Sequence, residues 1–263
     1  MRFPFFSKKK NRYVLVISWG WMRWFYWGWV FKAIDELWLR DRVDAIFWVS
    51  AWALLASYWA AWYEANKIVE LFLDSEFMSL SKDINLLPKT SILSNKMLKK
   101  QIERDLPETF EELKIPIFVG CTNTNEWQNV ILSSWDLTSA LMWTIAIPWI
   151  FPAVERDNMM LIDGGVTNNF PLAIAKERFP HHKIIWISLN KYQKNQKIRN
   201  LFDNLLVSFE IMLRKDIEPQ WALADVFFHK KLETPVLEFN KTKLRKLYNM
   251  WYEDWIEKLK DLV

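Results

Sequence analysis

Short apolar runs alternate with segments of helical periodicity along most of the chain. Apolar or β-branched runs predict buried strands, and apolar positions three and four residues apart predict helices. The predicted strands are 13–17, 43–47, 115–121, 129–132, 159–162 and 183–189. The predicted helices are 25–37, 50–61, 66–73, 94–104, 137–146, 172–178, 197–215 and 243–262. This alternation predicts an α/β fold with a mostly parallel central sheet.

The same pattern divides the chain into three parts. Residues 1–12 form a basic N-terminal lead-in, 13–189 the α/β core, and 190–263 a helical C-terminal portion expected to pack on the core. In the lead-in, apolar residues precede the basic cluster of Lys8, Lys9, Lys10 and Arg12, which is the reverse of a secretory signal. We therefore expect a cytoplasmic protein. A weak attraction of this cluster to anionic lipid head groups is the lesser alternative.

The segment Ala45–Tyr63 carries no charged residue over nineteen positions, a length that allows a transmembrane helix. Its four tryptophans, at 48, 52, 59 and 62, are spread along it, whereas membrane tryptophans gather at the two interfaces. We favour a buried strand, turn and helix, with a single membrane span as the alternative.

Composition narrows the classes of function. The chain is 51% hydrophobic and 25% charged, which excludes a disordered protein. A lone cysteine, Cys121, excludes a disulfide framework and a cysteine zinc site. A net charge of +4 without a basic stripe argues against nucleic-acid binding. Glycine is abnormally rare and tryptophan abnormally common, with 5 and 18 residues respectively.

Three segments that follow predicted strands carry candidate chemistry, since ligands bind at the carboxyl ends of strands in open α/β sheets. The first, 18–24, leads into a helix whose N-terminus can bind an anion. The second contains Ser50 between a strand and a helix, which projects a serine hydroxyl above the sheet. The third is Asp163-Gly164-Gly165. Taken alone, Ser50 is typical of a helix N-cap and Asp163 of a turn.

Together, the three segments resemble the patatin-like phospholipase family, of the compact bacterial type. That family has the motifs G-G-G-x-R-G, G-x-S-x-G and D-G-G or D-G-A. Here they correspond to Trp19–Trp24, Trp48–Trp52 and Asp163–Gly165, in the same order and at similar intervals. A proline-containing segment at 147–153 agrees as well, and the resemblance covers about 13–189.

The resemblance implies a three-layer α/β/α domain that hydrolyses phospholipid or related lipid acyl esters through an acyl-enzyme. By position, Ser50 is the nucleophile and Asp163 the base, without a histidine. The oxyanion hole is implied at Gly20, Trp21, Met22 and Arg23, with Trp19, Trp24, Trp48, Trp52, Gly164 and Gly165 as the other motif positions. No cofactor and no metal are implied. Lipid substrates lead us to expect peripheral contact with the inner membrane surface.

The departures from the family pattern are systematic. Tryptophan stands where the family has glycine at Trp19, Trp21, Trp24, Trp29, Trp48, Trp52 and Trp149. It also stands where turns or helix ends suit glycine at Trp38, Trp62, Trp135 and Trp251. Our hypothesis is that UGA codons read as glycine in the source organism are written here as tryptophan. If the tryptophans are real, the alternative is a catalytically inactive, lipid-binding or membrane-associated relic, because indoles crowd the serine turn.

Overall fold

The structure, a computed structural model, describes residues 11–17, 25–74, 91–188, 198–212, 218–229 and 252–262. Its strands are β1 (Tyr13–Ile17), β2 (Val43–Val49), β3 (Ile117–Asn123), β4 (Gln128–Leu132), β5 (Val154–Arg156), β6 (Met159–Asp163), β7 (Lys183–Ser188) and β8 (Val226–His229). Its α-helices are α1 (Phe25–Glu36), α2 (Trp52–Ala60), α3 (Ala65–Asp74), α4 (Lys96–Asp105), α5 (Leu137–Thr144), α6 (Leu172–Arg178), α7 (Leu201–Met212) and α9 (Tyr252–Lys260). The predicted alternation of strands and helices is confirmed.

One mixed sheet forms the middle layer, in the order β5-β6-β3-β2-β1-β7-β8, with β4 paired to β3. The pairs β1–β2, β1–β7, β2–β3 and β7–β8 are parallel. The pairs β3–β4, β3–β6 and β5–β6 are antiparallel. The mostly parallel sheet of the prediction is therefore confirmed, and its antiparallel part lies beyond β3.

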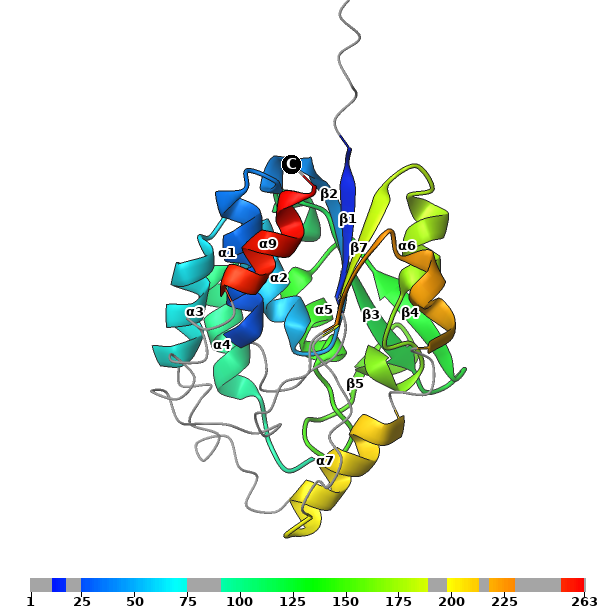
Figure 1. Cartoon of the computed structure of the whole chain (residues 1–263). Coiled ribbons are helices and arrows are strands. Elements are labelled where there is room, and N and C mark those ends of the chain that lie inside the picture. The colour runs from blue at the N-terminus through cyan, green and yellow to red at the C-terminus, as the bar shows by residue number, and fades with distance from the viewer. Residues whose placement is uncertain are drawn as a thin grey trace, which may run out of the picture.

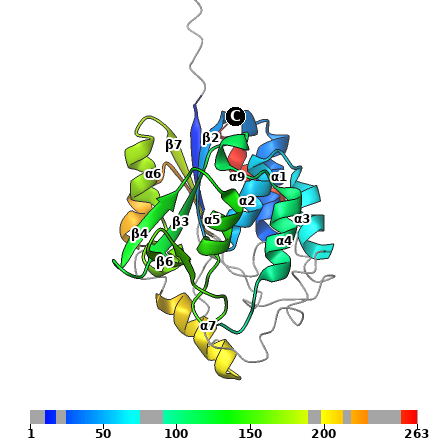
Figure 2. The ribbon, with the colours of Figure 1, turned by 180° about the vertical axis from the view of Figure 1, so that it is seen from behind.

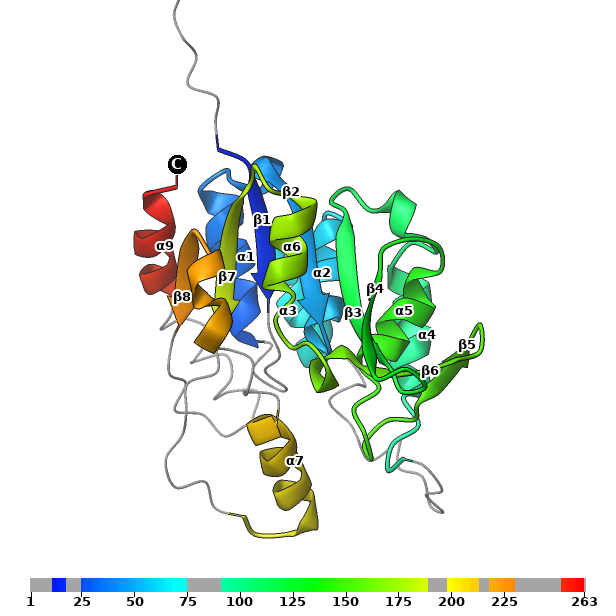
Figure 3. The same ribbon diagram turned by 90° about the vertical axis from the view of Figure 1, so that its right-hand side faces the viewer.

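Alternating side chains of the central strands separate the two outer layers. In β1, Leu15 and Ile17 belong to the larger core cluster, beneath α1, α2, α3, α5 and α9. Val14 and Val16 point to the opposite face and form a smaller core with residues of α6 (Figures 1 and 3). Because successive side chains of a strand face opposite sides, a fully buried strand such as β1 has to be covered on both faces. The layers are therefore α/β/α.

The uncharged segment Ala45–Tyr63 consists of most of β2, a turn and α2, as the favoured interpretation predicted. Within the described part of the chain, no helix is both long and apolar enough to span a membrane.

Two strands were not predicted. β5 has only three residues, too few to give a period, and β8 lies in the portion expected to be helical. β8 extends the core sheet next to β7. From the same portion, α9 packs against α1, and the ring of Tyr252 lies 5.9 Å from the ring of Trp29. Just after α9, the Leu262 carbonyl accepts a hydrogen bond from the Tyr13 hydroxyl of β1 at 2.8 Å.

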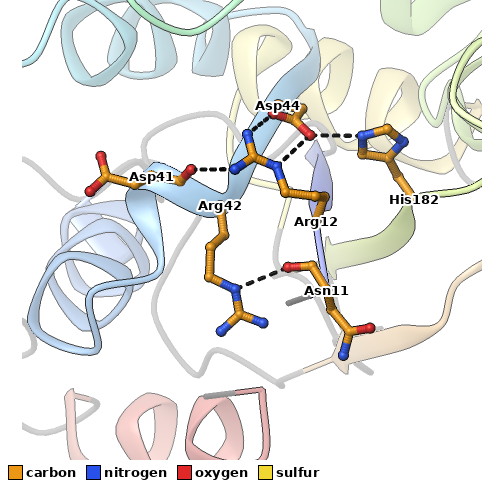
Figure 4. Close-up of polar contacts among 6 residues, drawn as sticks. All are labelled: Asn11, Arg12, Asp41, Arg42, Asp44 and His182. Atoms are coloured by element: carbon orange, nitrogen blue, oxygen red, sulfur yellow. Dashed lines mark hydrogen bonds and ion pairs between the residues drawn. The ribbon is translucent and has the colours of Figure 1, made fainter. Parts of the chain in front are cut away.

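A polar cluster ties together the amino ends of β1, β2 and β7 (Figure 4). Arg12 Nε donates to an Asp44 carboxylate oxygen at 2.8 Å, and His182 Nε2 lies 2.8 Å from the same oxygen. The hydrogen bond from Arg12 is the main reason that the pKa of Asp44 is lowered. This cluster lies at the opposite end of these strands from Ser50, so His182 is remote from the candidate site.

Candidate active site

Ser50 occupies the turn between β2 and α2, with φ of 69°. Its side chain is fully buried, and its carbonyl accepts a hydrogen bond from Ala53 N–H at 2.9 Å, which starts the helix. A left-handed φ is uncommon for a residue other than glycine, and such strained residues cluster at functional sites. This strand–serine–helix turn has the form of a nucleophile elbow.

The end of β2 meets the end of β6 along one edge of β3. β4 pairs with residues 119–123 of β3, so β2 and β6 share the other edge. Val49 pairs with Gly120, and Asp163 pairs with the next residue, Cys121. Because β2 runs parallel to β3 and β6 antiparallel, their last residues approach head to head. Ser50, which follows Val49 directly, is thereby brought next to Asp163.

Asp163 is held by three hydrogen bonds. Its backbone N–H donates to the Ala146 carbonyl at 3.0 Å, and its carbonyl accepts from Thr122 Oγ1 at 2.9 Å. Its Oδ1 accepts from Gly165 N–H at 2.8 Å, so Asp163 is the N-cap of the short helix Gly164–Val166. The residue is fully buried, so the orientation of its carboxyl group is fixed.

Burial raises the pKa of Asp163 to about 7, against the opposing effects of the Ser50 hydroxyl and the Gly165 N–H. Desolvation disfavours a charged carboxylate, which explains the direction. Ser50 Oγ and Asp163 Oδ2 are both buried, and neither completes a hydrogen bond within the described residues. The hydroxyl therefore lies beside the carboxyl group without a well-aligned bond to it, as is common in free enzymes.

Two glycines allow this close approach of the strands. A Cβ atom at Gly164 would lie 2.3 Å from the carbonyl oxygen of Gly120, a backbone atom that cannot move away. A Cβ atom at Gly120 would lie 2.9 Å from Val49 Cγ2. Gly164 is thus required for contact between the Asp163 turn and β3. Gly165 contributes its N–H to Asp163 instead.

Thr144, at the end of α5, is a contact that the sequence did not indicate. Its Oγ1 accepts from Ser50 N–H at 2.8 Å and donates to the Gly120 carbonyl at 2.6 Å. Figure 2 shows α5 beside β3. A threonine within an apolar helix resembles any core residue, so only the fold identifies it.

Several predicted residues fall elsewhere or cannot be placed. Gly20, Trp21, Met22, Arg23, Trp19 and Trp24 lie outside the described residues. Trp48 is fully buried in β2, with its ring 6.0 Å from Phe31, and Trp52 is the first residue of α2. Burial raises the pKa of the Cys121 thiol, which keeps it protonated and poorly nucleophilic.

A strand–serine–helix turn at the carboxyl end of a mostly parallel sheet is the form that the nucleophile elbow takes in α/β hydrolases. The family model described as Patatin-like phospholipase matches residues 15–176. The chain belongs to the patatin-like phospholipase family.

Two solved structures share this fold. VipD from Legionella pneumophila has a TM-score of 0.58 and 11% identity, over 96% of this chain and 66% of that one. The type III effector protein ExoU has a TM-score of 0.52 and 10% identity, over 96% of this chain and 53% of that one. The chain thus spans slightly under two thirds of VipD and about half of ExoU. The predicted fold class is confirmed.

Proposed function

We propose that this chain is a serine acyl hydrolase that cleaves lipid acyl esters, of phospholipids or related lipids. The observation that carries the proposal is Ser50 in a left-handed elbow, buried beside an aspartate whose pKa is raised to about 7. Family membership supports the choice of a lipid ester as substrate.

In the proposed reaction, Ser50 Oγ attacks the ester carbonyl while Asp163 accepts the hydroxyl proton. The tetrahedral intermediate collapses to an acyl-serine, and the alcohol leaves with the proton held by Asp163. Asp163 then takes a proton from water as the water attacks the acyl-serine, and it returns that proton to Ser50 when the fatty acid leaves. A base with a pKa near the working pH is efficient both in forming the acyl-serine and in hydrolysing it.

The oxyanion would be held by the backbone N–H groups of Gly20, Trp21 and Met22, with Arg23 ordering that loop. This assignment rests on the motif alone. Each such donor contributes about 3–4 kcal/mol to transition-state stability, so the loop is expected to matter as much as the proton transfer.

We further propose that α7 contacts the lipid surface. α7 lies beyond the carboxyl end of the sheet, the end at which β2 leads into Ser50 (Figures 1 and 3). Leu201, Ile211 and Met212 on this helix are exposed. A helix with an exposed apolar face can bury that face in a lipid interface. Binding to zwitterionic phospholipid vesicles that falls in the double variant Leu201→Asp and Ile211→Asp would support this contact, and unchanged binding would contradict it.

Hydrolysis of a chromogenic acyl ester by the purified chain tests the proposed function. Ser50→Ala is expected to abolish turnover. Ser57→Ala is the matched control, because Ser57 is a buried serine of α2 whose hydroxyl donates to the Ala53 carbonyl. Turnover that survives Ser50→Ala refutes the nucleophile. Lipid binding without any turnover favours the non-catalytic alternative.

A further inference from the structure

The last turn of α5 and the residues after it contact both candidate catalytic residues. Thr144 Oγ1 accepts from Ser50 N–H at 2.8 Å. Two residues further on, the Ala146 carbonyl accepts from Asp163 N–H at 3.0 Å. Three consecutive residues, 144–146, therefore connect the end of β2 to the end of β6. We call these residues the brace.

Both hydrogen-bonding roles of the Thr144 hydroxyl are fixed. The hydroxyl proton goes to the Gly120 carbonyl at 2.6 Å, which leaves the oxygen lone pairs to accept from Ser50. Val49 and Gly120 are the last residues paired between β2 and β3. Beyond this last pair, the Thr144 hydroxyl links Gly120 of β3 to Ser50, the residue after β2. Thr144 is fully buried.

We propose that Thr144 is a positioning residue, which holds the Ser50 amide so that the serine hydroxyl faces Asp163. The proposal rests on the hydrolase function proposed above. An amide fixed at Ser50 sets the left-handed backbone of the elbow, and that backbone sets the direction of the hydroxyl. Thr144 acts only through Ser50. Small misplacements of reacting groups cost large factors in rate.

The test compares Thr144→Val, which keeps the side-chain shape, with Thr144→Ser, which keeps the hydroxyl. For a chromogenic acyl ester, kcat of Thr144→Val should fall about tenfold or more with KM nearly unchanged. Thr144→Ser should stay within about twofold of the unmodified chain. Thr138→Val, the same change at another buried threonine of α5, should leave kcat unchanged.

Hydrogen–deuterium exchange at the Ser50 amide gives a readout that needs no activity. Exchange should accelerate in Thr144→Val alone. An inactive parent chain overturns the proposed function but leaves the exchange result to decide the brace. An active parent with equal kcat in Thr144→Val overturns the positioning role. A lower kcat in both Thr144→Val and Thr144→Ser, with unchanged exchange, overturns it as well.

A different observation carries a second inference, about residue identity. Nine non-glycine residues in the described part of the chain have positive φ, and five of them are tryptophan: Trp38, Trp62, Trp127, Trp135 and Trp149. None of the described glycines has positive φ. Left-handed backbone favours glycine and disfavours large side chains. The sequence had indicated all of these positions except Trp127.

The same five tryptophans are 47–85% exposed, and they are the tryptophans that the described residues show as exposed. Other tryptophans are fitted to their surroundings. Trp59 stacks on Phe31 at 4.6 Å and donates to Asp35 Oδ1 at 3.0 Å. Trp186 packs between Phe170 and Phe227. Backbone conformation and exposure thus separate two kinds of tryptophan position.

We infer that glycine occupies the five left-handed positions in the protein as its organism makes it. The resemblance to the family motif G-x-S-x-G, rather than backbone conformation or exposure, extends the inference to positions 48 and 52, since Trp48 is fully buried. UGA codons read as glycine account for this pattern. In the source gene, UGA is expected at 38, 48, 52, 62, 127, 135 and 149, and UGG at 59 and 186. UGG at the left-handed positions overturns the inference.

One tryptic peptide, Val43–Lys67, tests the inference at the protein level, because it contains both kinds of position. Tandem mass spectrometry of natively made protein should read glycine at 48, 52 and 62 and tryptophan at 59. Tryptophan at 62 refutes the inference. In recombinant protein, Trp62→Gly should raise the thermal midpoint, whereas Trp59→Gly should lower it; the reverse order also refutes it.

Discussion

At the scale of single residues, burial gives Asp163 the properties that a base needs and also makes it costly to the fold. The carboxyl group lies in a fully buried site and keeps one oxygen, Oδ2, without a hydrogen bond among the described residues. The motifs in the sequence point to Ser50 and Asp163, because their residue types and order are distinctive, and the catalytic roles of both residues stay predictions. Thr144 and the Ala146 carbonyl could not be found in this way, since backbone groups and a helical threonine leave no local pattern.

The first prediction concerns the pH dependence of hydrolysis. As the proposed base, Asp163 must be ionised to accept the serine proton, and its pKa is raised to about 7. We expect kcat/KM to fall about tenfold per pH unit below pH 7 and to level off above it. A pH–rate profile with the chromogenic ester measures this, and a rate independent of pH between about pH 5 and 7 would contradict it.

The second prediction concerns stability. The pKa of Asp163 in the folded chain lies above its ordinary value of 3.8, so ionisation weakens the fold as pH rises from about 4 to about 7. Asp163→Asn removes the ionisation and keeps an acceptor for Gly165 N–H. The unfolding free energy of Asp163→Asn should therefore equal that of the unmodified chain at about pH 4 and exceed it by about 4 kcal/mol above pH 7.

Urea unfolding of both chains at several pH values provides the measurement. The same variant should be inactive at every pH, which separates its catalytic effect from its effect on folding. A stability difference that does not change with pH would show that Asp163 is not the buried ionising group.

At the scale of elements, the sequence predicted most strands and helices, because the central strands are continuous apolar runs and the helices have apolar residues at helical spacing. The sequence did not predict that the ends of β2 and β6 meet head to head. Their head-to-head contact depends on the pairing of Val49 with Gly120 and of Asp163 with Cys121, and register between distant strands has no local signal. The antiparallel return through β6 is what brings Asp163 to Ser50.

The third prediction tests this contact with a pair of glycine variants. Gly164→Ala places a Cβ 2.3 Å from the backbone oxygen of Gly120, so β6 must move away from β3. We expect a loss of about 3 kcal/mol or more in unfolding free energy, and loss of hydrolysis. In Gly120→Ala the new Cβ is too close only to a side-chain atom, Val49 Cγ2 at 2.9 Å, so this change should cost less unfolding free energy. Thermal unfolding of both variants measures the two losses of stability. A larger loss for Gly120→Ala than for Gly164→Ala would be inconsistent with the pairing of β3 with β2 and β6.

At the scale of the whole molecule, the two ends of the described chain lie together. α9 covers α1 on the larger core face, and the Tyr13 hydroxyl at the start of β1 binds the Leu262 carbonyl (Figure 1). The sequence suggested a packed C-terminal helix from its periodicity, but not its partner. The path of the chain between the core and an amphipathic helix decides which face of the core the helix covers. The local sequence pattern does not encode that path.

The last prediction is that α9 and the sheet unfold as one unit. Leu259 is fully buried in the larger core, and its replacement by alanine should lower the unfolding free energy by about 3 kcal/mol. Glu257→Ala, at an exposed position of the same helix, should change it by less than about 0.5 kcal/mol. Because β1 shares this core, ester hydrolysis and the helical signal in circular dichroism should be lost at the same urea concentration. Leu259→Ala should lower both midpoints by the same amount. Loss of helix before loss of activity would instead show that α9 is an independent appendage and that the site at the sheet's carboxyl end does not depend on it.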